Sequence, residues 1–419
     1  MTEQSSQDFS ALGLNQPLID ALTERGYTHP TPIQSAAIPV ILAQQDVMAG
    51  AQTGTGKTAA FALPILQQLC MTDCTAQNRR PVRALVLTPT RELAQQVYQS
   101  LVNYGKHSPL KTALVYGGAS INTQIAELTA GVDILVATPG RLLDLVQRGA
   151  ADLSKVQHLV FDEADRMLDM GFIDEIKRIL KSIPDERQTL LFSATFDQAI
   201  FALSKTLLRT PTLIEVDARN TAAIQVEQII YAVDAERKRE LVSHLIGAKN
   251  WNQVLIFTRT KQSADLLASE MGKDGLKALS IHGDKSQGAR ERALEQFRQG
   301  ELRALVATDV AARGLDIDQL KYVINYELPY NAEDYIHRIG RTGRAGGSGL
   351  AISLLSSEEN YLLEEIEVIL NNSLLPQWLP GYEPDLNRVM PASRKNSAAA
   401  QKNRARARAL GKKPAKHPR

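Results

Sequence analysis

The sequence predicts an α/β protein built from two parallel-sheet domains, and three observations support this fold class. Short apolar runs alternate with segments of helical periodicity, which is typical of a parallel sheet covered by helices. The alternation restarts after residues 217–221, so two similar domains are expected, joined by a linker at residues 216–226. The length of 419 residues also exceeds the size at which a single hydrophobic core is common.

The first domain is expected at residues 1–215. Polar segments follow three of its apolar runs, at residues 88–91, 138–141 and 193–195. Ligands bind outside the carboxyl ends of parallel strands, so these segments are expected to form a functional rim. The strands themselves are expected at residues 83–87, 112–116, 133–136, 158–161 and 189–192.

The second domain is expected at residues 227–375 and repeats the arrangement. Polar residues again follow its runs, at 258–260, 282–283 and 308–309. Residues 358–370 have apolar positions at helical spacing and are expected to pack on this domain as a helix. The strands are expected at residues 254–257, 278–281, 304–306, 322–325 and 350–354.

The end of the chain, residues 376–419, is expected to be a loop followed by a short disordered basic tail. The net charge of the whole chain is +2, but residues 386–419 hold eleven Lys or Arg and no acidic residue, so residues 1–385 carry a net charge of −9. The tail is poor in large apolar residues and cannot fold alone. It is interpreted as a nucleic-acid tether, with a solubilising tail as the alternative.

Residues 50–58, with the sequence GAQTGTGKT, are typical of a phosphate-binding loop. Glycines let backbone N–H groups close around phosphate oxygens, the following helix directs its positive end at them, and Lys57 adds a cation. Thr58 is expected to hold Mg²⁺ through its hydroxyl. Ala51 departs from the general pattern, which has its first glycine there, and a plain Gly/Thr-rich turn is the alternative.

Residues 159–165, with the sequence LVFDEAD, place acidic side chains at the end of an apolar run. Asp162 is expected to end a buried strand and to hold Mg²⁺ through water, and Glu163 to polarise the attacking water. Together with the phosphate-binding loop, this segment predicts hydrolysis of a nucleoside triphosphate.

Residues 337–344, with the sequence HRIGRTGR, contribute cations from the second domain. Their spacing predicts that Arg338, Arg341 and Arg344 lie on one side of a helical turn. Such a run alone also fits a solvated basic helix face. Because the other domain carries a phosphate-binding loop, Arg341 and Arg344 are interpreted as arginine fingers, which would make hydrolysis depend on domain closure.

Several classes of protein are disfavoured by composition. The only two cysteines, Cys70 and Cys74, have no His or Cys cluster nearby to complete a zinc site, and reduced thiols are expected. No run of about 18 apolar residues and no signal-peptide region is present. The protein is therefore expected to be soluble and cytoplasmic, without a membrane partner.

Taken in order, these motifs closely resemble those of the DEAD-box ATP-dependent RNA helicases of superfamily 2, of a bacterial type nearest to RhlE. The resemblance covers residues 9–356, and Ala51 matches the phosphate-binding loop of this family. It implies two tandem RecA-like domains that use ATP and Mg²⁺. The matching segments are residues 26–34 (the Q motif), 89–94, 117–118, 138–141, 162–165, 193–195, 287–290, 307–316 and 337–344.

The resemblance also implies a role for each residue near the nucleotide. Gln34 would read the adenine edge, Tyr27 would stack on the ring, and Phe9 would support it, although both aromatics alone fit plain core positions. Lys57, Asp162, Glu163, Arg341 and Arg344 would be the catalytic residues. The remaining ATP contacts would be Gln52, Thr53, Gly54, Thr55, Gly56, Lys57, Thr58, Gly314 and Asp316.

For RNA, the resemblance implies contacts from hydroxyls, glycine amides and arginines, which suit a sugar-phosphate backbone and not base reading. Each arginine taken singly fits a surface ion pair equally well. The implied RNA-binding residues are Thr90, Arg91, Gly118, Thr138, Gly140, Arg141, Thr258, Arg259, Arg290 and Thr308. The residues implied to couple the domains are Asp165, Ser193, Thr195 and His337.

The implied function is RNA-stimulated ATP hydrolysis that closes the two domains on one RNA strand and separates a duplex locally. An ATP-gated RNA clamp or ribonucleoprotein scaffold is the alternative, and a DNA translocase is disfavoured by residues 162–165 and the Q motif. The protein is expected to be a monomer that binds duplex and single-stranded RNA, with ribosome precursors or RNA-degradation proteins as partners. No RNA-recognition motif names a particular RNA.

Overall fold

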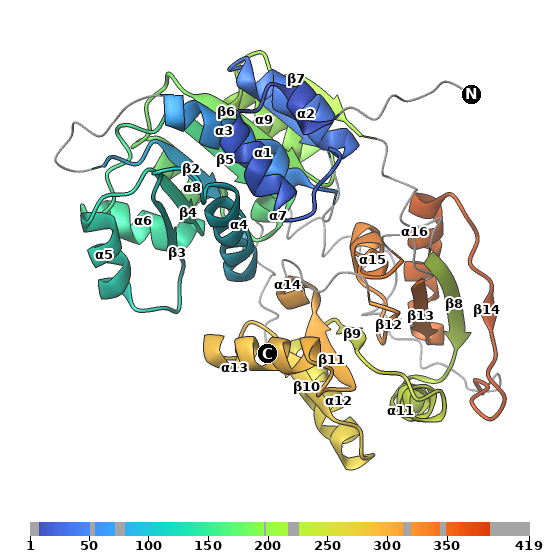
Figure 1. Cartoon of the computed structure of the whole chain (residues 1–419). Coiled ribbons are helices and arrows are strands. Elements are labelled where there is room, and N and C mark those ends of the chain that lie inside the picture. Colours follow the sequence, from blue (N-terminus) through green and yellow to red (C-terminus); the bar gives the residue numbers. More distant parts are fainter. Residues whose placement is uncertain are drawn as a thin grey trace, which may run out of the picture. The chain divides into compact units, whose positions relative to one another are not determined.

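The computed structural model forms two compact units, each built around one seven-stranded parallel sheet (Figure 1). The predicted residues Gln52, Thr53, Gly54, Gly314, Asp316 and Arg344 lie outside the part that the structure describes, as do nearly all of the linker and the whole basic tail. The described residues are 8–50, 55–71, 80–196, 198–216, 226–312, 320–343 and 349–385.

The N-terminal sheet has the strand order β3-β4-β2-β5-β6-β1-β7. All five predicted strands are confirmed, whereas β1 and β7 were not predicted. The strands that carry the nucleotide motifs, β5, β6 and β1, are neighbours in the middle of the sheet and end at the same edge. The bounds are β1 (Val47–Gly50), β2 (Ala84–Leu87), β3 (Thr112–Val115), β4 (Ile134–Ala137), β5 (His158–Asp162), β6 (Gln188–Ser193) and β7 (Thr212–Glu215).

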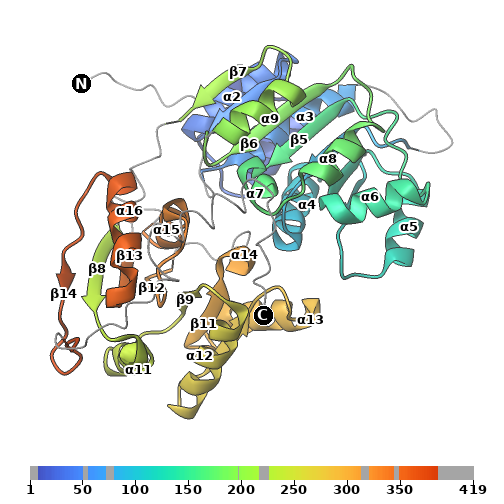
Figure 2. The ribbon, with the colours of Figure 1, turned by 180° about the vertical axis from the view of Figure 1, so that it is seen from behind.

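Helices cover both faces of this sheet, which explains why its strands read as continuous apolar runs (Figures 1 and 2). Successive residues point to opposite faces: Val160 packs in one core and Phe161 in the other. One core contains η1 (Phe9–Leu12), α1 (Gln16–Thr23), α2 (Pro32–Leu42), α3 (Lys57–Met71) and α4 (Arg91–Tyr104). The other contains α5 (Ile121–Thr129), α6 (Pro139–Gln147), α7 (Ala164–Asp169), α8 (Ile173–Leu180) and α9 (Gln198–Leu207).

The C-terminal sheet has the order β10-β11-β9-β12-β13-β8-β14. Its five predicted strands are confirmed, and β8 was missed. The prediction of a loop from residue 376 was wrong at its first two residues, because Pro376 and Gln377 pair with β8. The bounds are β8 (Val226–Ala232), β9 (Val254–Thr258), β10 (Ala278–Ile281), β11 (Ala304–Thr308), β12 (Tyr322–Asn325), β13 (Gly349–Leu355) and β14 (Pro376–Gln377).

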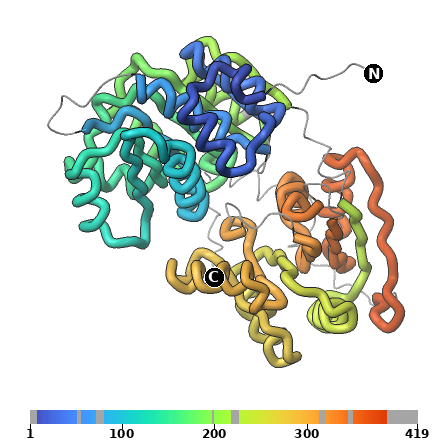
Figure 3. The backbone as a smooth tube through the Cα atoms, viewed as in Figure 1, coloured from blue at the N-terminus to red at the C-terminus, as the bar shows by residue number. Residues whose placement is uncertain are grey.

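Helices also flank the C-terminal sheet, and the tube in Figure 3 shows that each sheet takes its strands from one half of the chain. α11 (Lys238–Ala248) and α12 (Lys261–Lys273) pack in one core, and α15 (Ala332–Ile339) and α16 (Asn360–Leu370) in the other. The predicted helix at residues 358–370 is confirmed by α16. The second half of the chain also forms η2 (Ala235–Arg237), α13 (Gln287–Arg298), α14 (Asp309–Ala312) and η3 (Ser357–Glu359).

Candidate functional site

Lys57 and Asp162 form the centre of the candidate nucleotide site. Lys57 begins α3, just after the loop that follows β1, and Asp162 ends β5. Their side chains are buried, and Lys57 Nζ lies 4.0 Å from Asp162 Oδ1. Neither atom has a hydrogen-bond partner among the described residues. Burying unsatisfied charged groups is costly, so this pair is suited to receive a ligand that supplies the missing contacts.

The surroundings of Asp162 also favour a cation. The pKa of its carboxyl group is raised to about 6, mainly by burial and also by the charges of Glu163 and Asp165, while Lys57 opposes the rise. A divalent ion at this carboxylate would offset the cost of its negative charge. Thr58, the second residue of α3, is half-buried at the same edge. A nucleotide phosphate chain with Mg²⁺ therefore fits this pair.

Glu163 is held in a conformation that few residues adopt. Its backbone has φ 57° and ψ 55°, the left-handed region, directly before α7. A non-glycine residue there is strained, and such strain clusters at functional sites. The Glu163 carboxylate is buried and forms an ion pair with Arg166, one turn further along α7. This contact orients the carboxylate beside Asp162.

Asp165 connects the acidic segment to the end of β6. Its Oδ2 accepts hydrogen bonds from the Ala194 amide at 3.2 Å and the Thr195 hydroxyl at 3.5 Å. The Thr195 amide in turn lies 3.4 Å from the Ser193 hydroxyl oxygen. The structure thus brings Asp165, Ser193 and Thr195 together within the N-terminal unit. Their predicted coupling to the second domain stays a prediction.

Gln34 joins the Q motif to the phosphate-binding loop. It lies in the first turn of α2, where its Oε1 accepts the Thr31 amide at 2.9 Å in a capping box. Its Nε2 donates to the Gly56 carbonyl at 3.1 Å. Gly56 has φ +93°, and a Cβ atom there would lie only 2.3 Å from Gln34 Nε2. Glycine is therefore required, and the residue proposed to read adenine also supports the loop.

Tyr27 and Phe9 are placed differently from each other. Phe9 is buried in the core beside α1 to α4. Tyr27 is 43% exposed, and its ring packs at a tilt against Tyr104, with centroids 6.4 Å apart. Arg25 lies 6.0 Å from both ring centroids. An exposed ring with a packed back fits the predicted stacking role of Tyr27.

Three of the predicted RNA-binding residues meet around one turn of the N-terminal unit. Gly118 has φ +88°, and a Cβ atom there would lie 2.3 Å from Arg91 Nη1, so the guanidinium needs a glycine below it. Arg141 donates from Nη1 and Nη2 to the Ala119 carbonyl, each at 3.2 Å, and from Nη1 to Gln124. Arg141 therefore supports this turn. Sequence reasoning missed Gln124, which has no motif signal.

The other predicted residues of this rim lie at helix starts. Thr90 caps α4, and its hydroxyl oxygen accepts the Leu93 amide at 3.3 Å. Thr138 precedes α6, and both threonines are buried. Gly140 has open space where a Cβ atom would lie. The carboxyl edge of the sheet thus carries hydroxyl and backbone groups beside two arginines.

In the C-terminal unit the predicted helical turn of arginines was wrong. α15 ends at Ile339, so Arg338 is helical and Arg341 is not, and the Arg341 carbonyl accepts the Leu320 amide at 3.1 Å beyond the helix. Neither side chain is solvated, with exposed fractions of 1% and 2%. Arg338 forms a bidentate pair with Asp309, at 2.6 and 2.8 Å, which assigns it a structural role.

The remaining predicted residues from the second half of the chain follow strands or lie on helices. Thr258 ends β9 and Thr308 ends β11, and both are buried. Arg290 lies in α13, and His337 is half-buried in α15. The Arg259 guanidinium contacts the carboxylates of Glu359 at 3.1 Å and Glu327 at 3.7 Å. The ion-pair interpretation of Arg259 is thus what the structure shows, and its RNA contact stays a prediction.

Comparisons with known proteins agree with this geometry. A profile described as DEAD/DEAH box helicase matches residues 31–203, and one described as helicase conserved C-terminal domain matches residues 237–346. ATP-dependent RNA helicase RhlB of Pseudomonas syringae is 42% identical over 87% of this chain and 93% of its own length. The chain belongs to the DEAD-box family of ATP-dependent RNA helicases. ATP-dependent RNA helicase CshA of Listeria monocytogenes is 41% identical to this DEAD-box chain, over 90% of it and 71% of CshA.

Solved DEAD-box structures have the same fold. Dbp5 of Saccharomyces cerevisiae, bound to RNA and ADP BeF3, matches with a TM-score of 0.76 and 31% identity, over 88% of this chain and 95% of that one. Mss116p, bound to single-stranded RNA and AMP-PNP, matches with a TM-score of 0.79 and 28% identity, over 90% and 80%. The prediction of two tandem RecA-like domains is confirmed. The RhlE type stays a prediction.

Among the described residues, no helix combines the length and the apolar character that crossing a membrane requires.

Proposed function

We propose that this DEAD-box helicase couples ATP hydrolysis to closure of its two sheet units on one RNA strand, and so separates short duplexes without regard to sequence. The single observation that carries the proposal is the buried pair Lys57–Asp162, whose facing atoms have no hydrogen-bond partner among the described residues. A triphosphate would satisfy Lys57, and Mg²⁺ would satisfy Asp162. The rim around Gly118 supplies sugar-phosphate contacts beside this site.

The residues divide the chemistry among them. When bound, Mg²⁺ neutralises charge on the phosphates, and Asp162 and Thr58 would hold it, partly through water. Lys57 would bind phosphate oxygens. Glu163, oriented by Arg166, would accept a hydrogen bond from the attacking water and hold it in line. Arg341 would stabilise charge that develops in the transition state.

A strand-displacement assay tests the proposal. The protein should release a labelled strand from a short RNA duplex only with ATP, and RNA should stimulate ATP hydrolysis. Retention of RNA in the ATP state without strand release would instead indicate a clamp. Stimulation by DNA as strong as by RNA would favour a DNA translocase. We further propose a cytoplasmic monomer of the RhlE type that acts on ribosome precursors or with RNA-degradation proteins, on the bacterial pattern of its motifs.

Replacing Gln34 by Ala should reduce the preference for ATP over GTP by about tenfold, because the amide offers adenine both a donor and an acceptor. Guanine presents the opposite groups at position six. The measurement is the ratio of kcat/KM for ATP and GTP under saturating RNA, with dATP as a third substrate.

Gln67→Ala is the matched control for this experiment. The Gln67 amide also bridges two backbone groups, the Asn15 amide at 2.7 Å and the Gly13 carbonyl at 2.9 Å, but it does not contact Gly56. The control should keep the ATP preference. Equal use of GTP and ATP by the unmutated protein would refute the role of Gln34.

Deleting residues 391–419 should weaken RNA binding and leave the ATPase rate without RNA unchanged, because the deleted segment follows every catalytic motif. The segment carries ten basic residues, and the acidic remainder of the chain gains from a basic tether. The plot of log affinity against log salt should become shallower by about 0.7 for each RNA phosphate that the tail no longer neutralises.

A tail of the same length with its ten Lys and Arg replaced by Gln separates charge from length. This variant should behave like the deletion. Parallel salt plots for the full-length and shortened proteins would show that the tail solubilises the protein or binds another partner.

A further inference from the structure

Arg259, one of the predicted RNA-binding residues, packs on the C-terminal unit against Tyr330, an exposed residue that no predicted motif includes. Tyr330 lies between β12 and α15, and its side chain is 67% exposed. The Arg259 guanidinium lies over its ring, 4.8 Å from the centroid. Arg259 follows β9 directly, and β9 pairs with β12, so both residues lie at the carboxyl edge of the sheet. A tyrosine ring beside an arginine is typical of surfaces that stack nucleobases.

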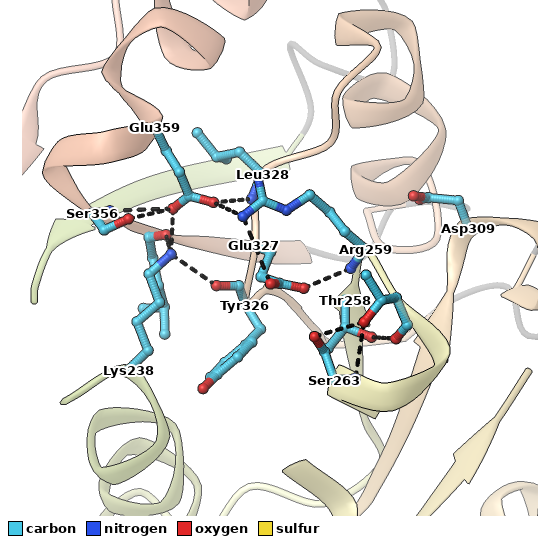
Figure 4. A network of polar contacts seen from close by, with 12 residues as sticks. Lys238, Thr258, Arg259, Ser263, Asp309, Tyr326, Glu327, Leu328, Ser356 and Glu359 are labelled. Carbon is cyan, nitrogen blue, oxygen red and sulfur yellow. Dashed lines mark hydrogen bonds and ion pairs between the residues drawn. The ribbon is translucent and has the colours of Figure 1, made fainter. Parts of the chain in front are cut away.

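Glu359 fixes the position of this arginine. Its carboxylate is buried, with 3% of the residue exposed, accepts hydrogen bonds from four donors and forms an ion pair with Arg259 (Figure 4). Oε1 lies 3.1 Å from Arg259 Nη2 in this ion pair and accepts from the Leu328 amide at 3.3 Å. Oε2 accepts from Lys238 Nζ and from the amide and hydroxyl of Ser356, the last at 3.0 Å. Glu359 thereby ties together the ends of β9, β12 and β13.

The same network places cations around Glu359 and holds the turn after β9. Lys238 is buried and also donates to the carbonyls of Tyr326 at 3.1 Å and Leu354 at 2.7 Å. Burial lowers the pKa of Lys238, and the charge of Glu359 opposes this. The Arg259 amide donates to Glu327 Oε2 at 2.7 Å. The positive charges of Lys238 and Arg259 therefore balance the negative charges of Glu327 and Glu359, which limits the free-energy cost of burying them.

The guanidinium of Arg259 is only partly used by these contacts. Nη2 faces Glu359 and Glu327, whereas no described residue accepts a hydrogen bond from Nε or Nη1. The side chain keeps 19% of its surface exposed. One edge of the planar group is thus held by carboxylates, and the other edge is available to an incoming acceptor. A phosphate oxygen is the acceptor that suits such an edge.

We propose that Tyr330 and Arg259 form one RNA contact of this helicase, with the ring against a base or ribose and the guanidinium edge on a phosphate, and that Glu359 is a positioning residue for it. The inference deepens the proposed function and rests on it. It also gives a role to Glu359, which lies beyond both family matches, at residues 31–203 and 237–346.

The test measures RNA-stimulated ATPase of the full chain with single-stranded oligonucleotides as the RNA. Tyr330→Ala should raise the RNA concentration for half-maximal stimulation at least about fivefold, with kcat at saturating RNA retained, because the contact binds RNA and does not touch ATP. Tyr330→Phe should restore the unmutated value, since the ring persists. Glu359→Gln, which keeps shape and loses charge, should also raise that concentration.

The double variant, Tyr330→Ala with Glu359→Gln, separates positioning from a general structural role. If both residues serve one contact, its effect should be smaller than the product of the single effects. Asp274→Asn is the control, because it removes an exposed ion pair with Arg239 at the C-terminal end of α12. It should leave RNA affinity unchanged.

Three outcomes would overturn the inference. If Tyr330→Ala needed the same RNA concentration for half-maximal stimulation as the unmutated protein, the stacking contact would be ruled out. Glu359→Gln with lowered kcat and melting temperature but unchanged half-saturation would reduce Glu359 to a structural role. If Tyr330→Phe bound RNA as weakly as Tyr330→Ala, the contact would depend on the tyrosine hydroxyl and not on the ring. Absence of RNA stimulation in the unmutated protein would refute the proposed function itself, which is a separate result.

Discussion

Replacing Glu163 by Gln is expected to lower RNA-stimulated ATP hydrolysis by roughly 100-fold or more, because the amide cannot act as the base that orients the attacking water. ATP and RNA binding should persist. The amide oxygen of Gln can still accept from Arg166, so the left-handed backbone at this position should keep its support. The measurement is single-turnover hydrolysis together with the affinity for a fluorescent ATP analogue. The variant should accumulate bound to RNA and ATP.

Glu175→Gln serves as the matched control for Glu163→Gln. Glu175 is a half-buried carboxylate on α8 of the same unit, and its Oε2 has no hydrogen-bond partner among the described residues. The control should hydrolyse ATP at the unmutated rate. A near-normal rate in Glu163→Gln protein that binds both ligands would exclude Glu163 as the base.

Arg341→Ala should lower turnover by roughly 10³- to 10⁵-fold with little change in ATP affinity, since an arginine finger acts on the transition state. Single-turnover hydrolysis and ATP binding by the full chain check this. Arg341→Lys should recover only part of the rate, because an ammonium lacks the planar fork of donors.

The contrast with Arg338 makes the Arg341 experiment specific. The Arg338 guanidinium donates hydrogen bonds to Asp309, Asn325 and the Glu327 carbonyl. Its replacement by Ala should destabilise the protein by about 3–5 kcal/mol, as expected for a broken buried pair, and lower the melting temperature. If Arg341→Ala hydrolysed ATP normally, no catalytic role would remain for Arg341.

Most of the strands that the sequence predicts are buried on both faces, and β3 and β10 are the exceptions. All ten have apolar residues at nearly every position, which makes them visible as apolar runs in the sequence. β7 and β8, which flank the linker, mix buried, half-buried and exposed positions and were not predicted. β1 has only four residues, and its run ends in the glycine of the phosphate-binding loop. Short or edge strands carry too few residues for a clear period.

The residues of the candidate site that lie within short sequence motifs could be predicted. Lys57 and Asp162 follow from their motifs, and the structure brings them within 4.0 Å. The spacing of Arg338 and Arg341 wrongly predicted that both lie on one helical turn, because Gly340 caps α15 between them. Glu359 could not be predicted, since its partners come from segments up to 121 residues away. Tertiary contacts of this kind leave no periodic or motif signal.

The two hydrogen bonds of Gln34 limit how this site can change over evolution. The Gln34 side chain bonds to both the Thr31 amide and the Gly56 carbonyl, so under the proposed adenine-reading role the base preference and the shape of the phosphate-binding loop depend on one residue. A substitution of Gln34 that favours another base would also remove the hydrogen bond that supports the loop. A change of nucleotide would therefore come with slower hydrolysis. A guanine-specific descendant would therefore need a compensating donor to Gly56, supplied by a second mutation, before the first could be tolerated.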